Sequence, residues 1–133
     1  MMKQMNQDQM NRLNGITQQI IGAAIAVHKE FGPGLLESVY EVCLMLEMEN
    51  NGLKVASQVE LPLWYKGKLT DKKFRIDLLV EDEIIVELKA VDSLLPIHEA
   101  QLLTYMKLTN KHLGLLINFN VPLLKDGIIR RII

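Results

Sequence analysis

The sequence contains a single cysteine, few aromatic residues and almost no net charge. Cys43 has no partner for an intramolecular disulfide or for a zinc cluster built on cysteines, which fits a reducing compartment. With 15 Lys and Arg against 16 Asp and Glu, the net charge is -1, so no overall positive field draws nucleic acid to the chain. Any surface that binds phosphate groups must therefore be local.

Long apolar runs are missing as well. The first residues are polar and lack the apolar core of a signal peptide, and Lys29 and Glu30 interrupt the longest candidate for a membrane span. We therefore expect a cytoplasmic protein without membrane association.

The chain has enough apolar residues for one core. Its 133 residues are 49% hydrophobic, which is typical of one globular domain. The polar, methionine-rich stretch 1–13 shows neither helical nor strand periodicity, and we expect it to be a flexible N-terminal segment. Residues 14–133 are expected to form the single domain.

Two helices are predicted at the N-terminal end. The first is capped by Asn14 and ends at the Gly32-Pro33-Gly34 turn, and the second opens near Leu35 and ends at Asn51-Gly52. The apolar face of the first helix is expected to contain Ile16, Ile20, Ala23, Val27 and Phe31. The second helix is expected to bury Leu36, Val39, Val42 and Leu46.

The rest of the chain alternates between strand-like and helical patterns. Three strands are predicted at 54–65, 69–80 and 84–91, as an antiparallel meander. A helix beginning near Pro96 and ending near Asn110 follows, and then come two strands, at 112–119 and 127–133. This order predicts an α+β (mixed α/β) domain, in which the strand after the last helix runs parallel to an earlier one through a helical crossover.

Charged residues interrupt the most apolar of these strands. Glu87 and Lys89 lie on one face of the strand Ile84–Val91, and an isolated charge inside a sheet is costly. If residues 81–83 form a hairpin loop, Asp77 falls opposite Glu87. Two facing carboxylates destabilise the pair unless a cation lies between them or one is protonated.

A divalent metal ion is one solution, and an ion pair is the other. A few carboxylate oxygens, with the peptide oxygen of Leu88, suit Mg²⁺ or Mn²⁺, and Lys89 is placed to orient a water or to neutralise a charged oxygen. An internal Glu87–Lys89 or Asp77–Arg75 ion pair without chemistry explains the pattern equally well.

The pattern of Asp77 followed by Glu87-Leu88-Lys89 resembles the metal motif of the PD-(D/E)XK nuclease superfamily. The stretch Gly34-Leu35-Leu36-Glu37-Ser38-Val39-Tyr40 matches a GxxExxY motif, and Gln101 with Tyr105 matches the QxxxY element of RecB-type nucleases. The chain thus resembles the GxxExxY family of that superfamily over roughly residues 16 to 133. Ile76 replaces the proline of the superfamily's name.

The resemblance implies a restriction-endonuclease-like α-β-β-β-α-β core, with an extra N-terminal helix and a C-terminal strand. It further implies a Mg²⁺- or Mn²⁺-dependent nuclease that hydrolyses phosphodiester bonds in nucleic acid. The implied catalytic residues are Glu37, Asp77, Glu87 and Lys89. The implied metal ligands are Glu37, Asp77, Glu87 and Leu88, and the residues lining the site are Tyr40, Gln101 and Tyr105.

Several of these residues have structural interpretations too. Glu37 is favoured at a helix N-terminus by the helix dipole, and Tyr40 is more typical of packing than of catalysis. His98, Gln101 and Tyr105 share a helix face that either lines a site or faces water. The whole domain is alternatively a noncatalytic module that binds nucleic acid or protein.

Two surface segments are also ambiguous. The basic stretch 66–75 either protects a hairpin edge from aggregation or contacts phosphates, with Trp64 or Tyr65 nearby to stack on an unpaired base. The apolar C-terminal residues 128–133 either complete the sheet or pair with a second subunit in a homo-oligomer.

Overall fold

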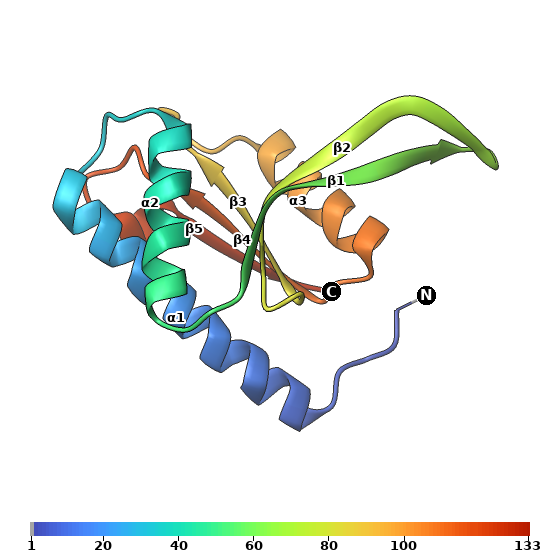
Figure 1. Ribbon diagram of the computed structural model, residues 1–133, viewed down its shortest axis with the longest axis horizontal. Helices are drawn as coiled ribbons and strands as arrows, with labels where there is room; N and C mark the ends of the chain where they lie inside the picture. Colours follow the sequence, from blue (N-terminus) through green and yellow to red (C-terminus); the bar gives the residue numbers. More distant parts are fainter. Residues whose placement is uncertain (1) are drawn as a thin grey trace.

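The computed structural model describes residues 2–133, which fold as a five-stranded mixed sheet between helices (Figure 1). The elements in chain order are α1 (Gln7–Phe31), α2 (Glu37–Asn50), β1 (Val55–Tyr65), β2 (Lys68–Val80), β3 (Ile84–Lys89), α3 (Pro96–Thr109), β4 (Leu113–Asn118), the 3₁₀ helix η1 (Leu124–Gly127) and β5 (Ile128–Ile132). The strands lie in the order β1-β2-β3-β4-β5, and β3 and β4 are parallel while the other neighbours are antiparallel. The predicted α+β class and the helical crossover are confirmed.

The sheet separates two apolar cores. Helices α1 and α2 cover one face, where Ile20, Leu44 and Val86 are among the buried residues, and α3 covers the other face, where Ile85 and Met106 pack together. Strands β3 and β4 lie in the middle of the sheet and are apolar on both faces, as expected for strands covered from both sides. The polar side chain of Glu87 is therefore placed in the most buried part of the fold.

Helix α1 begins earlier than the sequence indicates. Asn6 caps it, and the side chains of Asn6 and Gln9 each accept a hydrogen bond from the backbone N–H of the other, as a capping box does. Leu13 is buried against the core. The expected helix cap at Asn14 is wrong, because the cap at Asn6 and the buried Leu13 extend the helix by two mostly polar turns. Phe31, expected in the core, is exposed.

Helix α2 presents a different face to the core from the one expected. Its buried residues are Tyr40, Leu44 and Met48, spaced by four. The four residues that the sequence assigns to the core are instead exposed: Leu36, Val39, Val42 and Leu46. The helix is apolar on two sides, so periodicity alone does not select the buried one. The side chain of Tyr40 decides it, because its ring stacks on Phe119 with the centroids 4.5 Å apart.

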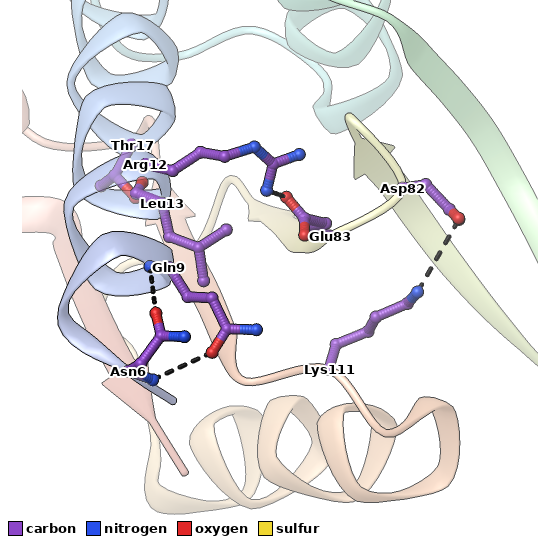
Figure 2. A network of polar contacts seen from close by, with 8 residues as sticks. All are labelled: Asn6, Gln9, Arg12, Leu13, Thr17, Asp82, Glu83 and Lys111. Atoms are coloured by element: carbon purple, nitrogen blue, oxygen red, sulfur yellow. Dashed lines mark hydrogen bonds and ion pairs between the residues drawn. The ribbon is translucent and has the colours of Figure 1, made fainter. Parts of the chain in front are cut away.

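Polar contacts hold the turn between β2 and β3 (Figure 2). Arg12 of α1 pairs with Glu83 of this turn, and Lys111, which precedes β4, lies 3.8 Å from the Asp82 carboxylate. The register Val80↔Ile84 confirms the predicted hairpin loop at residues 81–83. The β2–β3 hairpin is thus tied to α1 and to the loop between α3 and β4.

The β1–β2 hairpin is much longer than its neighbours (Figure 1). Its pairing runs from Val55↔Val80 to Tyr65↔Lys68, whereas β2 pairs with β3 only over Leu78–Val80. Residues 60–75 therefore form a two-stranded extension, which we call the arm: Leu61 and Phe74 at its base pack against the core beside α3, and the remainder projects from the sheet. No helix within residues 2–133 combines the length and the apolarity needed to cross a bilayer.

Candidate functional site

Asp77 and Glu87 lie side by side where β2 separates from β3. The last paired residues of this ladder are Leu78 and Val86, so Asp77 and Glu87 are the next opposed pair, as the hairpin register predicts. Oδ2 of Asp77 accepts a hydrogen bond from the backbone N of Leu88 at 2.9 Å, and Oε2 of Glu87 accepts one from the backbone N of Asp77 at 3.3 Å. Each carboxylate thus replaces a backbone acceptor where the ladder ends.

Strand β2 twists sharply at Asp77. Ile76 packs in the core beside α3, whereas Leu78 packs in the core beside α1 and α2, although residues two apart in a regular strand point to the same face. On β1, Gln58 opposite this point has a left-handed φ of 52°. The twist separates β2 from β3 and opens the sheet beside Asp77 and Glu87.

Glu87 is the most constrained of the polar residues in the site. Its side chain is 6% exposed, and its Oε1 atom is buried without a hydrogen-bond partner. Burial, and then the hydrogen bond and negative charge of Asp77, raise the pKa of Glu87 to about 9. A carboxylate in this position is unfavourable unless a proton or another cation accompanies it.

Lys89 does not form the ion pair that the sequence allows. The ion pairs within residues 2–133 involve other residues, so neither Glu87–Lys89 nor Asp77–Arg75 is present within 4.0 Å. Lys89 is half-buried two residues after Glu87, and its positive charge opposes the rise of the Glu87 pKa. The ammonium group is therefore close to the carboxylates but not joined to them.

Helix α2 brings further acidic side chains to the site. The pKa of Glu37 and that of Glu41 are both raised, first by burial, and the negative charge of Asp77 contributes to each. Gln58 donates a hydrogen bond of 2.6 Å to Glu41, and an open cleft of about 360 Å³ lies beside these residues. It is lined by Leu36, Glu37, Ser38, Glu41 and Gln58.

Glu41 and Gln58 are site residues that the sequence motifs do not indicate. Glu41 follows Glu37 by four residues and so shares its helix face, which was a usable signal. No pattern in the sequence indicates the left-handed backbone that places Gln58 there.

Helix α3 closes the other side of the site. Tyr105 is 5% exposed, and its pKa is raised by burial and then by the negative charges of Glu87 and Asp77. His98 lowers the pKa of Glu37 through its charge and bonds through Nδ1 to the backbone N of Leu95 at 3.0 Å. Gln101 lies on the helix between them and is exposed. The predicted polar face of this helix thus turns toward the carboxylates at Tyr105.

Tyr40 does not line the site. Its side chain is fully buried, and its hydroxyl group donates to the carbonyl of Gly32 at 2.5 Å and accepts from the backbone N of Leu35 at 3.1 Å. These bonds brace the turn between α1 and α2. The expectation that Tyr40 lines the site has no support in this position, and its packing interpretation is the one that these contacts favour.

Asn118, which belongs to none of the sequence motifs, anchors the end of β3. Asn118 is buried beside Lys89 in the register, and its side-chain amide bonds to both the N–H and the carbonyl of Val91, at 3.0 and 2.9 Å. The backbone N of Phe119 also donates to the carbonyl of Lys89 at 2.9 Å. The chain on which Lys89 lies is therefore fixed from β4.

The donor set fits a magnesium-type ion. Within residues 2–133, no three His, Cys, Asp or Glu side chains gather as an all-protein cage would require. Mg²⁺, however, is usually held by one or two carboxylates and completes its shell with water and substrate phosphates. Asp77 and Glu87 supply these carboxylates, and the partnerless Oε1 of Glu87 is the kind of oxygen that such an ion would satisfy.

Comparison with known proteins identifies the family. The chain matches the PD-(D/E)XK nuclease superfamily over residues 14–132, and it belongs to that superfamily. Comparisons with curated proteins and with solved structures find no match for this chain.

Proposed function

We propose that this protein is a divalent-metal-dependent nuclease, of the GxxExxY branch of its superfamily, which hydrolyses phosphodiester bonds in nucleic acid. The observation that carries the proposal is the facing pair Asp77 and Glu87, with one oxygen of Glu87 buried and without a partner. Mg²⁺ or Mn²⁺ is the cofactor that this donor set favours.

Each residue of the site has a distinct part in this proposal. Asp77 and Glu87 would hold the metal together with the peptide oxygen of Leu88, and when bound the ion would polarise the phosphate and activate the attacking water. The ammonium group of Lys89 offers positive charge where the phosphate oxygens gain negative charge in the transition state. Tyr105 of α3 is nearly buried and lies close enough to Glu87 and Asp77 for their charges to raise its pKa, after burial, so it would border the metal site on that side.

The acids on α2 have a separate part. Glu37 and Glu41 flank the cleft beside Asp77, where burial first, and then the negative charge of Asp77, raise the pKa of each. We assign Glu37 to the metal or to a water beside it, as the superfamily motif implies.

The test is cleavage of plasmid DNA, single-stranded DNA and RNA in Mg²⁺ or Mn²⁺. We expect Glu87→Gln and Lys89→Ala each to lower the cleavage rate by at least about 100-fold, because each removes charge from the reacting centre. The exposed residues Glu49 and Lys107 offer matched controls, Glu49→Gln and Lys107→Ala, which should cleave as the wild type does. Absence of cleavage of every polynucleotide, with chelator and added metal compared, would count against the proposal.

The second candidate is a noncatalytic module on the nuclease fold. It is favoured by the net charge of -1 and by the small number of acidic groups that gather in one place. Binding of nucleic acid without cleavage, and without any effect of Mn²⁺ on the melting temperature, is the result that this candidate expects.

A further inference from the structure

The arm carries the largest exposed aromatic side chains of the molecule. Trp64 is 59% exposed and Tyr65 is 64% exposed, and both lie at the end of the β1–β2 ladder farthest from β3. Trp64 is opposite Leu69 in the register, and Tyr65 is opposite Lys68. Leu69 is exposed too. A two-stranded hairpin that projects into water would not retain these groups for its own stability, since it buries little of their surface.

The arm is also the most basic part of the chain. Residues 60–75 contain five Lys and Arg and two Asp and Glu, a net charge of +3, whereas the whole chain has -1. Lys73 is paired with Glu60 at 2.9 Å. Among the described residues, no carboxylate lies within ion-pair distance of Lys66, Lys68 or Lys72. The local positive field that the whole molecule lacks is therefore concentrated here.

Lysines on a hairpin edge often prevent aggregation, but that role does not account for this surface. An edge protected by charge has no need of an exposed tryptophan next to it. Lys66 lies over the ring of Tyr65, with Nζ 5.5 Å from the ring centroid, so positive charge and aromatic face are combined at the tip. Such a combination matches a ligand that offers both flat rings and phosphates.

We propose that the arm binds a single-stranded segment of nucleic acid, with a base stacked on Trp64 or Tyr65 and phosphates contacting Lys66, Lys68 and Lys72. The bases that contact the arm must be unpaired, because in a duplex the faces of each base are covered by the neighbouring bases. That the ligand is nucleic acid rests on the proposed function. Binding by the arm would add to that function a preference for single-stranded substrate.

The position of the arm suits this role. Strand β2 runs from the arm tip at Lys68 directly to Asp77, so one continuous strand connects the basic surface with the carboxylates (Figure 1). A strand of nucleic acid held along the arm is thereby directed toward the point where β2 leaves β3. The arm would select unpaired substrate and lead it to the site.

Trp64 is the only tryptophan, so its fluorescence reports on the arm alone. The full chain in EDTA is titrated with a dT oligonucleotide of about 20 nucleotides, and then with a duplex of equal length. We expect the oligonucleotide to quench Trp64 and the duplex to leave it nearly unchanged. In anisotropy measurements with a labelled oligonucleotide, Trp64→Ala should weaken binding by about 5-fold to 100-fold, as loss of one stacked base does.

Matched variants separate the arm from the rest of the surface. Phe31 is an exposed aromatic residue on α1, and Phe31→Ala should leave the affinity unchanged. Lys66→Ala with Lys68→Ala should lower the slope of log affinity against log salt by about 1.4, since each phosphate contact on a single strand contributes about 0.7. Lys29→Ala with Lys125→Ala, which removes two exposed lysines outside the arm, should leave this salt slope unchanged.

The outcomes distinguish this inference from the nuclease proposal. Quenching of Trp64 and arm-dependent binding without cleavage would support binding by the arm and contradict the nuclease proposal. Cleavage and single-strand affinity that are the same in the wild type, in Trp64→Ala and in Tyr65→Ala, with no quenching of Trp64, would support the nuclease proposal and overturn the proposed role of the arm. A Trp64→Ala variant that instead converts a dimer into a monomer would overturn the inference in favour of a contact between two copies of the chain.

Discussion

Glu87 is the residue at which the stability of the fold and the chemistry of the site conflict. It is nearly buried, it faces Asp77, and one of its oxygens has no partner within the protein. Each of these features opposes ionisation, yet a metal site needs the ionised form. The metal-free protein is therefore expected to be less stable with Glu87 than with a neutral side chain of the same shape.

A pH titration of stability tests this conflict. The pKa of Glu87 is about 9 in the folded chain against 4.5 ordinarily, so between these values the folded state binds more protons than the unfolded state. Stability is then highest at low pH and falls as the pH rises, by at most about 1.4 kcal/mol per pH unit from this group.

The variant Glu87→Gln should flatten this slope and stabilise the protein at pH 8 in EDTA. Denaturant unfolding between pH 6 and pH 8 measures it, with Glu49→Gln as the control for loss of one exposed charge. A slope unchanged in Glu87→Gln would contradict the assignment, although the raised pKa values of Glu37 and Glu41 leave a smaller slope of the same sign.

Among the elements, β5 and the 3₁₀ helix before it pass unusually close to the end of β4. A Cβ atom on Gly127 would lie 2.2 Å from the carbonyl oxygen of Asn118, which is backbone and has little room to move. Asn118 is the residue that fixes the chain after Lys89. We expect Gly127→Ala to destabilise the protein by about 1–3 kcal/mol, as overpacking does.

The matched control is Gly22→Ala in the middle of α1. Nothing lies within 4 Å of a Cβ at Gly22, so the substitution should stabilise the protein by up to about 1 kcal/mol through helix propensity. Thermal unfolding of the two variants measures the contrast. Equal melting temperatures would show that the close approach of Gly127 to β4 is absent in solution.

The face that α2 buries gives a second test at this scale. Leu44 is fully buried and Leu46 is 56% exposed on the same helix, so Leu44→Ala should cost about 2–5 kcal/mol and Leu46→Ala less than about 1 kcal/mol. Denaturant midpoints measure both. A larger loss of stability in Leu46→Ala than in Leu44→Ala would mean that α2 buries the face that helical periodicity favours.

The elements show what the sequence specifies and what it does not. The strand order around Glu87 was predictable because β3 and β4 are apolar on both faces and because residues 81–83 form a short loop, so the register follows from the alternation. That register is enough to bring Asp77 and Glu87 together.

The missed features depend on tertiary contacts or on backbone geometry. The buried face of α2 depends on Tyr40 stacking on Phe119, a residue far away in the chain. The cleft at Glu41 depends on the left-handed backbone of Gln58, and the length of the arm depends on where β3 stops pairing. Periodicity, which reports only on neighbours along the chain, contains none of this.

At the scale of the whole molecule, metal binding should appear as a gain in stability. An ion that binds the folded chain and not the unfolded one stabilises by about 2.7 kcal/mol at 100 times its dissociation constant. Mn²⁺ should therefore raise the melting temperature of the wild type in proportion to the logarithm of its concentration. In Asp77→Asn the rise should disappear, and a rise retained in that variant would place the ion elsewhere.

The hairpin that joins Asp77 and Glu87 has a consequence for how the molecule folds. The two acids are ten residues apart, so closing this loop costs little chain entropy compared with bringing α2 or α3 to the same place. Their mutual repulsion is then present as soon as this hairpin closes, and closing it does not require a docked helix. We therefore expect acidification, which protonates Glu87 and removes this repulsion, to speed the folding reaction itself.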